Sequence, residues 1–145
     1  MDKYKIVCDS REQKPLWTGD KIETRKLEVG DYSIAGKETL IAIERKSLGD
    51  LFGTLGKGHK RFKAELERAK EYEYFAIVID GSYSSCVNKE FPGSYHSKMK
   101  GYVITSILFT LHVKYGINIF FTNGRTESKR IIKDIFNSYY KLYNV

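Results

Sequence analysis

Cysteine is scarce in this sequence. Of its 145 residues, only Cys8 and Cys86 are cysteines. Their spacing matches no metal-ligand motif, and a disulfide framework would need more cysteines in so short a chain. We therefore expect two reduced thiols, one in a strand and one in a loop, as is usual in a reducing compartment.

Long apolar runs are missing as well. None reaches the ~18 residues that a membrane-spanning helix needs. Residues 1–5 lead directly into a short apolar strand, without the longer apolar core and the cleavage site of a signal peptide. We expect an intracellular protein, in the cytoplasm of a microbe or of a phage-infected cell, or in the nucleus of a eukaryote.

Internal repeats, low-complexity tracts and linkers rich in Pro, Gly or Ser are not found either. The chain is 41% hydrophobic and 30% charged, which is the balance of a folded domain and not of a disordered chain. Its length suits one hydrophobic core. We predict a single domain over residues 1–145.

Positive charge and aromatic residues, in contrast, are plentiful. The net charge is +7 and the isoelectric point about 9.3, which favours polyanionic partners such as nucleic acids, although many basic proteins bind none. There are eleven tyrosines and eight phenylalanines. We expect most of them in the core or in an interface, and a few are candidates for stacking on unpaired bases.

Hydrophobic periodicity predicts an α/β layer fold around a mixed sheet. The predicted strands are 3–8, 21–29, 32–34, 39–44, 75–79 and 117–121, and the predicted helices are 48–55, 60–73, 98–115 and 127–143. Ser47 is the expected N-cap of the helix 48–55, with Asp50 three residues later. The helix 98–115 is apolar nearly all round, so we expect it to be buried on more than one side. The polar segment 82–97 is expected to be an irregular connection.

Charged residues gather near the predicted strand ends, where side chains of neighbouring strands converge. Phosphodiester hydrolysis needs hard oxygen ligands for a divalent ion, usually Mg²⁺, and a cation close to the phosphate. Asp31 and Glu44 end successive strands and are predicted to share one ion. Lys46 lies two residues after Glu44 and therefore on the same face of a strand, whereas Arg45 points the other way. Acid-x-lysine is the second half of the PD-(D/E)XK nuclease pattern, with Asp31 as the acid of the first half.

Each of these residues alone has an ordinary explanation. Glu44 and Lys46 suit a surface ion pair, Gly30-Asp31 suits a turn, and Asp50 suits the first turn of a helix. Only their combination, in this order and at this spacing, points to a nuclease site.

The combination resembles the nuclease domain of the XPF family. That family's signature is Gly-Asp followed by Glu-Arg-Lys-x-x-x-Asp, and it is matched by Gly30-Asp31 and by residues 44–50. Residues 7–12 resemble the family's opening strand and Asp-x-Arg-Glu turn, and the likeness continues through Arg61-Phe62 over essentially the whole chain. It implies a restriction-endonuclease-like fold, with a central mixed sheet flanked by helices, and a cut in branched DNA that depends on Mg²⁺ or Mn²⁺.

Site residues are implied by the same resemblance, position by position. The implied catalytic residues are Asp9, Asp31, Glu44, Lys46 and Asp50. Among them, Asp31 and Glu44 are the best metal ligands, Asp9 is a further one, and Lys46 assists the attack. The implied DNA-binding residues are Arg11, Arg45, Lys60 and Arg61, of which Arg11 and Arg45 have the alternative role of fixing the acids.

Two departures from the family pattern stand out. The family often has glutamine four residues after the arginine that Arg61 matches, and here that place holds Glu65. Glu65 either adds charge near the site or is a solvated helix residue, and the second interpretation is favoured. His59 is expected to be a loop residue, and Glu12 an additional acid or a partner for Arg11. The second departure is that no helix-hairpin-helix or helicase domain is present, which suggests a stand-alone nuclease domain.

The leading hypothesis is a structure-specific DNA endonuclease that acts on flaps, forks or junctions. The alternatives are a non-catalytic DNA-binding scaffold of the same fold and a general PD-(D/E)XK nuclease. The glycine-rich stretch 53–58 lacks the Gly-Lys-Ser/Thr ending of a P-loop, so we expect a flexible connection beside the site. Because the family pairs through its last helices, we also expect a homodimer through residues 98–143.

Overall fold

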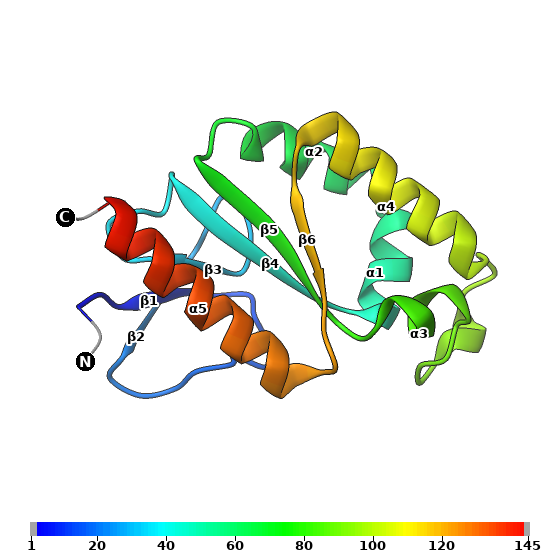
Figure 1. Cartoon of the computed structure of the whole chain (residues 1–145), viewed down its shortest axis with the longest axis horizontal. Helices are drawn as coiled ribbons and strands as arrows, with labels where there is room; N and C mark the ends of the chain where they lie inside the picture. Colours follow the sequence, from blue (N-terminus) through cyan, green and yellow to red (C-terminus); the bar gives the residue numbers. More distant parts are fainter. Residues whose placement is uncertain (1–2, 144–145) are drawn as a thin grey trace.

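A mixed six-stranded sheet is the centre of the computed structural model, which describes residues 3–143 (Figure 1). The strand order is β2-β1-β3-β4-β5-β6. The strands are β1 (Ile6–Asp9), β2 (Ile22–Arg25), β3 (Tyr32–Ile34), β4 (Ile41–Ser47), β5 (Tyr74–Asp80) and β6 (Asn118–Phe121). β3 runs antiparallel to β1 and β4, whereas the other neighbours are parallel. The predicted α/β fold with a mixed sheet is thus confirmed.

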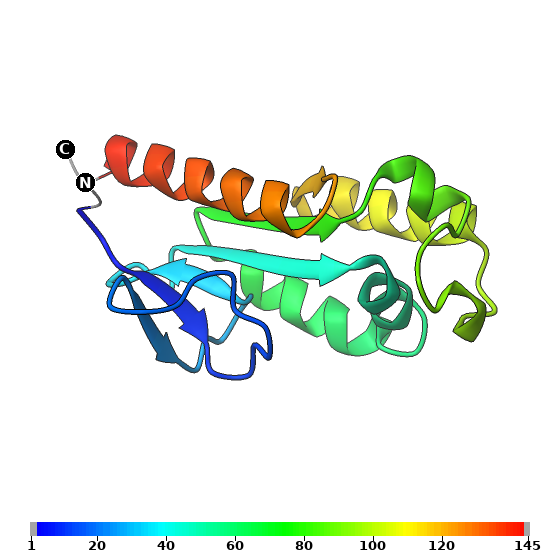
Figure 2. The same ribbon diagram turned by 90° about the horizontal axis from the view of Figure 1, so that it is seen from below.

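Helices cover both faces of this sheet (Figures 1 and 2). The core on one face includes residues of α1 (Leu48–Leu55), α2 (His59–Ala69) and α4 (Gly101–Tyr115), and the core on the other includes α5 (Arg125–Tyr143). β4 supplies both cores because successive residues of a strand point to opposite faces. Its Ala42 packs toward α1, α2 and α4, whereas Ile41 and Ile43 pack toward α5.

The amphipathic face predicted for the last helix is the one that α5 buries. Ile132, Phe136 and Tyr139 follow one another at helical spacing and pack against the sheet through residues such as Ala76 and Val78. Burial of side chains of this size contributes about 1.5–3 kcal/mol each. This packing secures the middle strands, which carry the site.

Several predicted boundaries shift for local reasons. α1 begins and ends as predicted, with the Ser47 hydroxyl accepting a hydrogen bond from the Asp50 N–H at 3.1 Å. β2 ends at Arg25, although the apolar alternation runs on to residue 29, because the Leu27 N–H donates to the Asp9 carboxylate instead of to a neighbouring strand. α2 ends at Ala69, and the N–H groups of residues 73 and 74 both donate to the Leu40 carbonyl, which turns the chain into β5.

The connection 82–97 is more regular than expected. It contains the short helix α3 (Tyr83–Val87) and the 3-10 turn η1 (Ser94–His96). Ser82 caps α3 by accepting a hydrogen bond from the Ser85 N–H at 2.9 Å, a signal that the sequence carried. Cys86 therefore lies in a helix and not in a loop. Both thiols are free, and burial raises the pKa of Cys8 and of Cys86 to about 11.

The prediction that α4 is buried on more than one side is wrong for this chain. Ile104, Leu108 and Leu111 are buried, but Tyr102 is 62% exposed and Val113 is 81% exposed. All-round apolar composition therefore leaves an open apolar face along α4. In the part of the chain that the structure covers, no helix combines the length and the hydropathy needed to cross a membrane.

Gly30, in the turn before β3, and Gly36, in the turn after it, together test how tightly the first of these turns is packed. Both have left-handed backbones, with φ of +76° and +86°. A Cβ on Gly30 would lie 3.0 Å from the Ile43 carbonyl oxygen, whereas a Cβ on Gly36 would meet nothing within 4 Å. We expect Gly30→Ala to lower the free energy of unfolding by about 2–3 kcal/mol and Gly36→Ala by about 1 kcal/mol. Urea denaturation measures both, and equal losses would contradict the packing argument.

Candidate active site

The turn before β3 places Asp31 against β4. The Asp31 N–H donates to the Ile43 carbonyl at 2.8 Å, and its Oδ2 accepts from the Arg45 N–H at 2.7 Å. Tyr32 is paired with Ile43 in the antiparallel ladder. The residues just beyond this pair, Asp31 and Glu44, therefore lie toward the same end of the two strands, as the sequence predicted.

Glu44 and Lys46 form an ion pair on one face of β4. The Lys46 Nζ lies 2.9 Å from the Glu44 Oε2, and the two side chains are only 18% and 9% exposed. This is the face that α1 and α2 cover, since Ala42 of the same strand packs there. The prediction that these two residues share a face, with Arg45 on the other, is confirmed.

A cavity of about 670 Å³ opens over this ion pair. Its walls come from β4, α1, α2, the glycine-rich turn between those helices and the segment after β2. The cations that line it are Arg11, Lys26, Lys46, Arg61 and Arg68, and the acids are Glu28, Glu44, Asp50 and Glu65. Glu44 and Lys46 are largely buried, whereas the four other cations are exposed. The floor of the cavity thus carries the Glu44–Lys46 ion pair, and its exposed rim has more basic than acidic side chains.

The buried carboxylates carry unfavourable negative charge. The pKa of Asp31 is raised to about 7, chiefly by burial and also by the Glu12 carboxylate, although the hydrogen bond from the Arg45 N–H lowers it. Burial, followed by the charge of Asp31, raises the pKa of Glu44 well above its usual value. For Lys46, burial lowers the pKa, but the carboxylates of Glu44, Asp31 and Glu65 together outweigh it and the net pKa is raised. One ammonium group therefore faces several carboxylates, a setting that favours an additional cation.

The carboxylates of Asp31 and Glu44 are suitable ligands for a hard divalent ion such as Mg²⁺. Within residues 3–143, no three His, Cys, Asp or Glu side chains are grouped closely enough to hold a metal by themselves. Mg²⁺ does not require this, because it is commonly held by one or two carboxylates and completes its shell with water and phosphate oxygens. The donor chemistry thus agrees with an ion that is shared with a phosphate.

Asp9, like Asp31, is not among the residues that line the cavity. It is 4% exposed, and its carboxylate accepts hydrogen bonds from the Arg11 Nε at 2.9 Å and from the Leu27 N–H at 2.8 Å. These bonds tie down the predicted metal ligand at the end of β1. They hold Arg11 at the cavity wall, where the Leu27 carbonyl also accepts from its guanidinium group.

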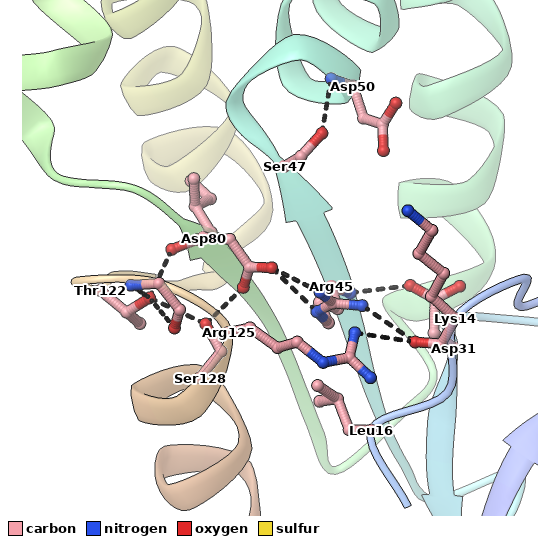
Figure 3. A network of polar contacts seen from close by, with 12 residues as sticks. Lys14, Leu16, Asp31, Arg45, Ser47, Asp50, Asp80, Thr122, Arg125 and Ser128 are labelled. Atoms are coloured by element: carbon pink, nitrogen blue, oxygen red, sulfur yellow. Dashed lines mark hydrogen bonds and ion pairs between the residues drawn. The ribbon is translucent and has the colours of Figure 1, made fainter. Parts of the chain in front are cut away.

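Arg45 points away from the cavity, into a polar network on the α5 side (Figure 3). Its Nη2 donates to the Asp80 Oδ2 at 2.6 Å, and the Ser128 hydroxyl donates to the other oxygen of Asp80. The Lys14 carbonyl accepts from both Arg45 and Arg125. Arg45 therefore links β4, β5, α5 and the loop after β1, a supporting position and not one at the cavity wall.

The other predicted residues divide between the cavity and the surface. Asp50 and Arg61 line the cavity, whereas Lys60 is exposed on α2 and does not. Glu12 lies on the Arg45 side, where its Oε2 accepts from the Tyr32 hydroxyl at 3.3 Å, so it is no partner of Arg11. His59 is the first residue of α2 and not a loop residue.

The sequence interpretation missed Glu65, Lys26 and Arg68 as residues of the cavity. Glu65 was expected to be a solvated helix residue, but its Oε2 accepts from the Gly30 N–H at 2.9 Å. The signal for it was present, since Glu65 occupies the position at which the sequence departs from the XPF pattern. Nothing in the sequence marked Lys26 or Arg68, because their place depends on how the segment after β2 and α2 pack together.

This fold is that of an XPF-nuclease-like α/β protein. XPF from Aeropyrum pernix matches with a TM-score of 0.67 and 22% identity over 92% of this chain and 60% of its own. The same protein in a complex with DNA matches with a TM-score of 0.70 and 23% identity over 96% and 66%. The chain thus spans less than two thirds of the length of these relatives. No curated protein matches the sequence.

The ERCC4 domain matches residues 8–135. That match covers most of the chain and every predicted site residue. The protein therefore belongs to the ERCC4 domain family, the XPF-type nuclease domains that the motif around Glu44 suggested.

The raised pKa of Asp31 leads to a prediction about stability. Because folded Asp31 titrates near pH 7 and an unfolded aspartate near pH 4, its contribution to stability is most favourable below pH 4 and declines as the pH rises to 7. In metal-free buffer, Asp31→Asn should therefore melt a few degrees above the wild type at pH 8 but close to it at pH 4. Calorimetry at both pH values checks this, with Asp50→Asn as an exposed control. A difference that does not depend on pH would contradict it.

Proposed function

We propose that this chain is a metal-dependent endodeoxyribonuclease that hydrolyses phosphodiester bonds in branched DNA such as flaps, forks or junctions. The observation that carries the proposal is the Glu44–Lys46 ion pair, which lines a cavity with a basic rim and has the half-buried Asp31 carboxylate next to it. Family membership supports it, since ERCC4 domains are XPF-type nuclease domains. A non-catalytic scaffold would not need buried acids that oppose their own ionisation.

Asp31 and Glu44 would hold Mg²⁺ or Mn²⁺, which when bound offsets phosphate charge and lowers the pKa of a water molecule. Lys46 keeps its proton beside Glu44, so its role is to orient the attacking water and to stabilise negative charge on the phosphate. Asp50 lines the cavity from the first turn of α1 and is proposed to bind a metal-bound water. Asp9 acts through Arg11, whose guanidinium group it orients.

Contacts with DNA are proposed for the exposed rim. Arg11 and Arg61 lie at the cavity wall, where they suit the phosphates on either side of the cut, and Lys60 would extend this surface along α2. Arg45 is proposed to support β4 through Asp80 instead of binding phosphate. The structure of the Aeropyrum relative with DNA supports a nucleic-acid partner. Because the proposed substrate is DNA, we also propose an intracellular location.

A homodimer is proposed through the open face of α4. Phe109 and Val113 lie there beside Tyr83 and Tyr102 along one shallow groove, and Phe109 also stacks near Phe121. Apolar side chains that are unusually exposed in a monomer mark interaction sites, and a two-fold axis would bury the same patch on both copies.

Replacement of single site residues tests the proposed chemistry. Lys46→Ala and Glu44→Ala should each lower the single-turnover rate of cleavage of an end-labelled flap in Mg²⁺ by at least about a hundredfold, since each removes a group that acts on the reacting phosphate. The measurement is denaturing electrophoresis of the products over a panel of flap, fork, junction, linear duplex and RNA substrates. Lys63→Ala, an exposed change on α2 outside the cavity, is the matched control.

Three outcomes would reject parts of this proposal. Robust cleavage by purified Glu44→Ala would reject the assigned site. Tight DNA binding by a wild type that cuts none of the substrates in Mg²⁺ or Mn²⁺ would favour the scaffold alternative. Equal rates on linear and branched DNA would point to a general nuclease.

Charge placed on the α4 face tests the dimer. Val113→Glu combined with Phe109→Glu should convert the dimer to a monomer, because a two-fold interface would then oppose four carboxylates. Light scattering after size exclusion measures the mass. Tyr95→Glu, at an aromatic residue that is 81% exposed outside residues 98–143, is the control. A wild type that is monomeric at high concentration would reject the dimer.

A further inference from the structure

Glu65 occupies an unusual position for a helix acid. It lies in α2 next to Leu66 and three residues after Phe62, both of which are buried in the core. Its side chain is therefore on the flank of the helix, half-buried, and it lines the cavity above Glu44. A carboxylate in such a place loses solvation and needs a polar partner.

The partner is the backbone of the turn that presents Asp31. The Gly30 N–H donates to the Glu65 Oε2 at 2.9 Å, across 35 residues of sequence. The next N–H, that of Asp31, donates to the Ile43 carbonyl of β4. The turn is thus held from two sides, by β4 and by α2, and Gly30 has no room for a side chain that would add other contacts.

The negative charge of Glu65 also acts on the acid pair. It adds to the burial that raises the pKa of Asp31 and of Glu44, and it acts on Lys46 and Arg11 as well. Three carboxylates therefore act on the Lys46 ammonium group, with Glu44 in direct contact. A neutral acceptor at this position would keep the bond to Gly30 but would remove one negative charge from the cavity.

We propose that Glu65 is a positioning residue of this site, which fixes the Gly30–Asp31 turn through its hydrogen bond and strengthens the binding of a divalent cation through its charge. The inference rests on the proposed function, in which Asp31 and Glu44 hold that cation. It assigns two separate effects to one side chain, and two substitutions separate them. Glu65→Gln removes the charge and keeps an acceptor for Gly30, whereas Glu65→Ala removes both.

The first measurement is calorimetric titration with Mn²⁺ in the absence of DNA. We expect Mn²⁺ to bind about tenfold more weakly to Glu65→Gln and at least as weakly to Glu65→Ala, and tenfold corresponds to about 1.4 kcal/mol. Glu67→Gln is the matched control, since it makes the same charge change on α2 but outside the cavity, beside Lys70 and Tyr115. It should bind Mn²⁺ as the wild type does.

The second measurement is amide hydrogen exchange at Gly30. Exchange should stay within about twofold of the wild type in Glu65→Gln and should accelerate tenfold or more in Glu65→Ala, because only the second variant lacks the acceptor. In cleavage assays, Glu65→Gln should need about tenfold more Mg²⁺ for half-maximal rate while its rate at saturating Mg²⁺ changes little. Glu65→Ala should also lose rate at saturation.

The inference is overturned if Glu65→Gln binds Mn²⁺ as tightly as the wild type, or if Gly30 exchanges at the wild-type rate in Glu65→Ala. Failure of the proposed function has a different signature. If Mn²⁺ binding and exchange respond as stated but no DNA is cut, the role of Glu65 stands and the nuclease proposal falls. If the wild type binds no Mn²⁺ at millimolar concentration, both are overturned.

Discussion

The contact between the Gly30–Asp31 turn and the middle of β4 is the constraint on which the site depends. A glycine with a left-handed backbone lets the turn approach the Ile43 carbonyl closely, and any side chain there would collide with it. That approach brings the Asp31 carboxylate onto the Arg45 N–H, next to Glu44. The Asp31 carbonyl in turn accepts from the Asp9 N–H, so β1 is joined to the same turn. The acid pair is therefore a product of backbone packing, and not of side chains that happen to meet.

Because side chains alternate along β4, the residues proposed for catalysis lie on one face of the strand and a residue that supports the strand lies on the other. Glu44 and Lys46 face the cavity, whereas Arg45 faces Asp80 and the α5 side. The support is needed because like charges in a buried place oppose folding, as the raised pKa values of Asp31 and Glu44 show. The Arg45–Asp80 pair and its hydrogen bonds to Ser128 and to the loop carbonyl of Lys14 hold the strand from behind. The Arg45–Asp80 network on one face of the sheet thus stabilises the fold, whereas the acids on the other face destabilise it. Such a trade between stability and activity is common at functional sites.

Sequence reasoning succeeds here where the physics is local. The period of two in β4 placed Glu44 and Lys46 together and Arg45 apart, and the Ser47 cap fixed the start of α1. It failed where a residue's place depends on packing between distant segments. Glu65 accepts a hydrogen bond from the Gly30 N–H only because α2 lies over the turn. The Asp9 carboxylate accepts one from the Leu27 N–H only because the chain after β2 leaves the sheet. Composition alone also misjudged α4, since an apolar helix face is the same in sequence whether a core or another molecule covers it.

The distribution of charge across the cavity separates binding from chemistry. Arg11, Arg61 and Arg68 are exposed at the rim, so the interactions with phosphates proposed for this rim would be screened by salt and would contribute affinity without regard to sequence. Glu44 and Lys46 lie deeper, with Asp31 next to Glu44, and low solvation strengthens the interactions of each charge there. In the proposed function, a phosphate would reach them only after the rim had bound the DNA backbone. Loss of a rim cation should therefore weaken binding and leave the bound rate nearly intact, whereas loss of a floor residue should do the reverse. If the chain cuts DNA as proposed, selection among DNA shapes would depend on the rim and on whatever covers the open face of α4, since the floor would contact only the phosphate at the cut.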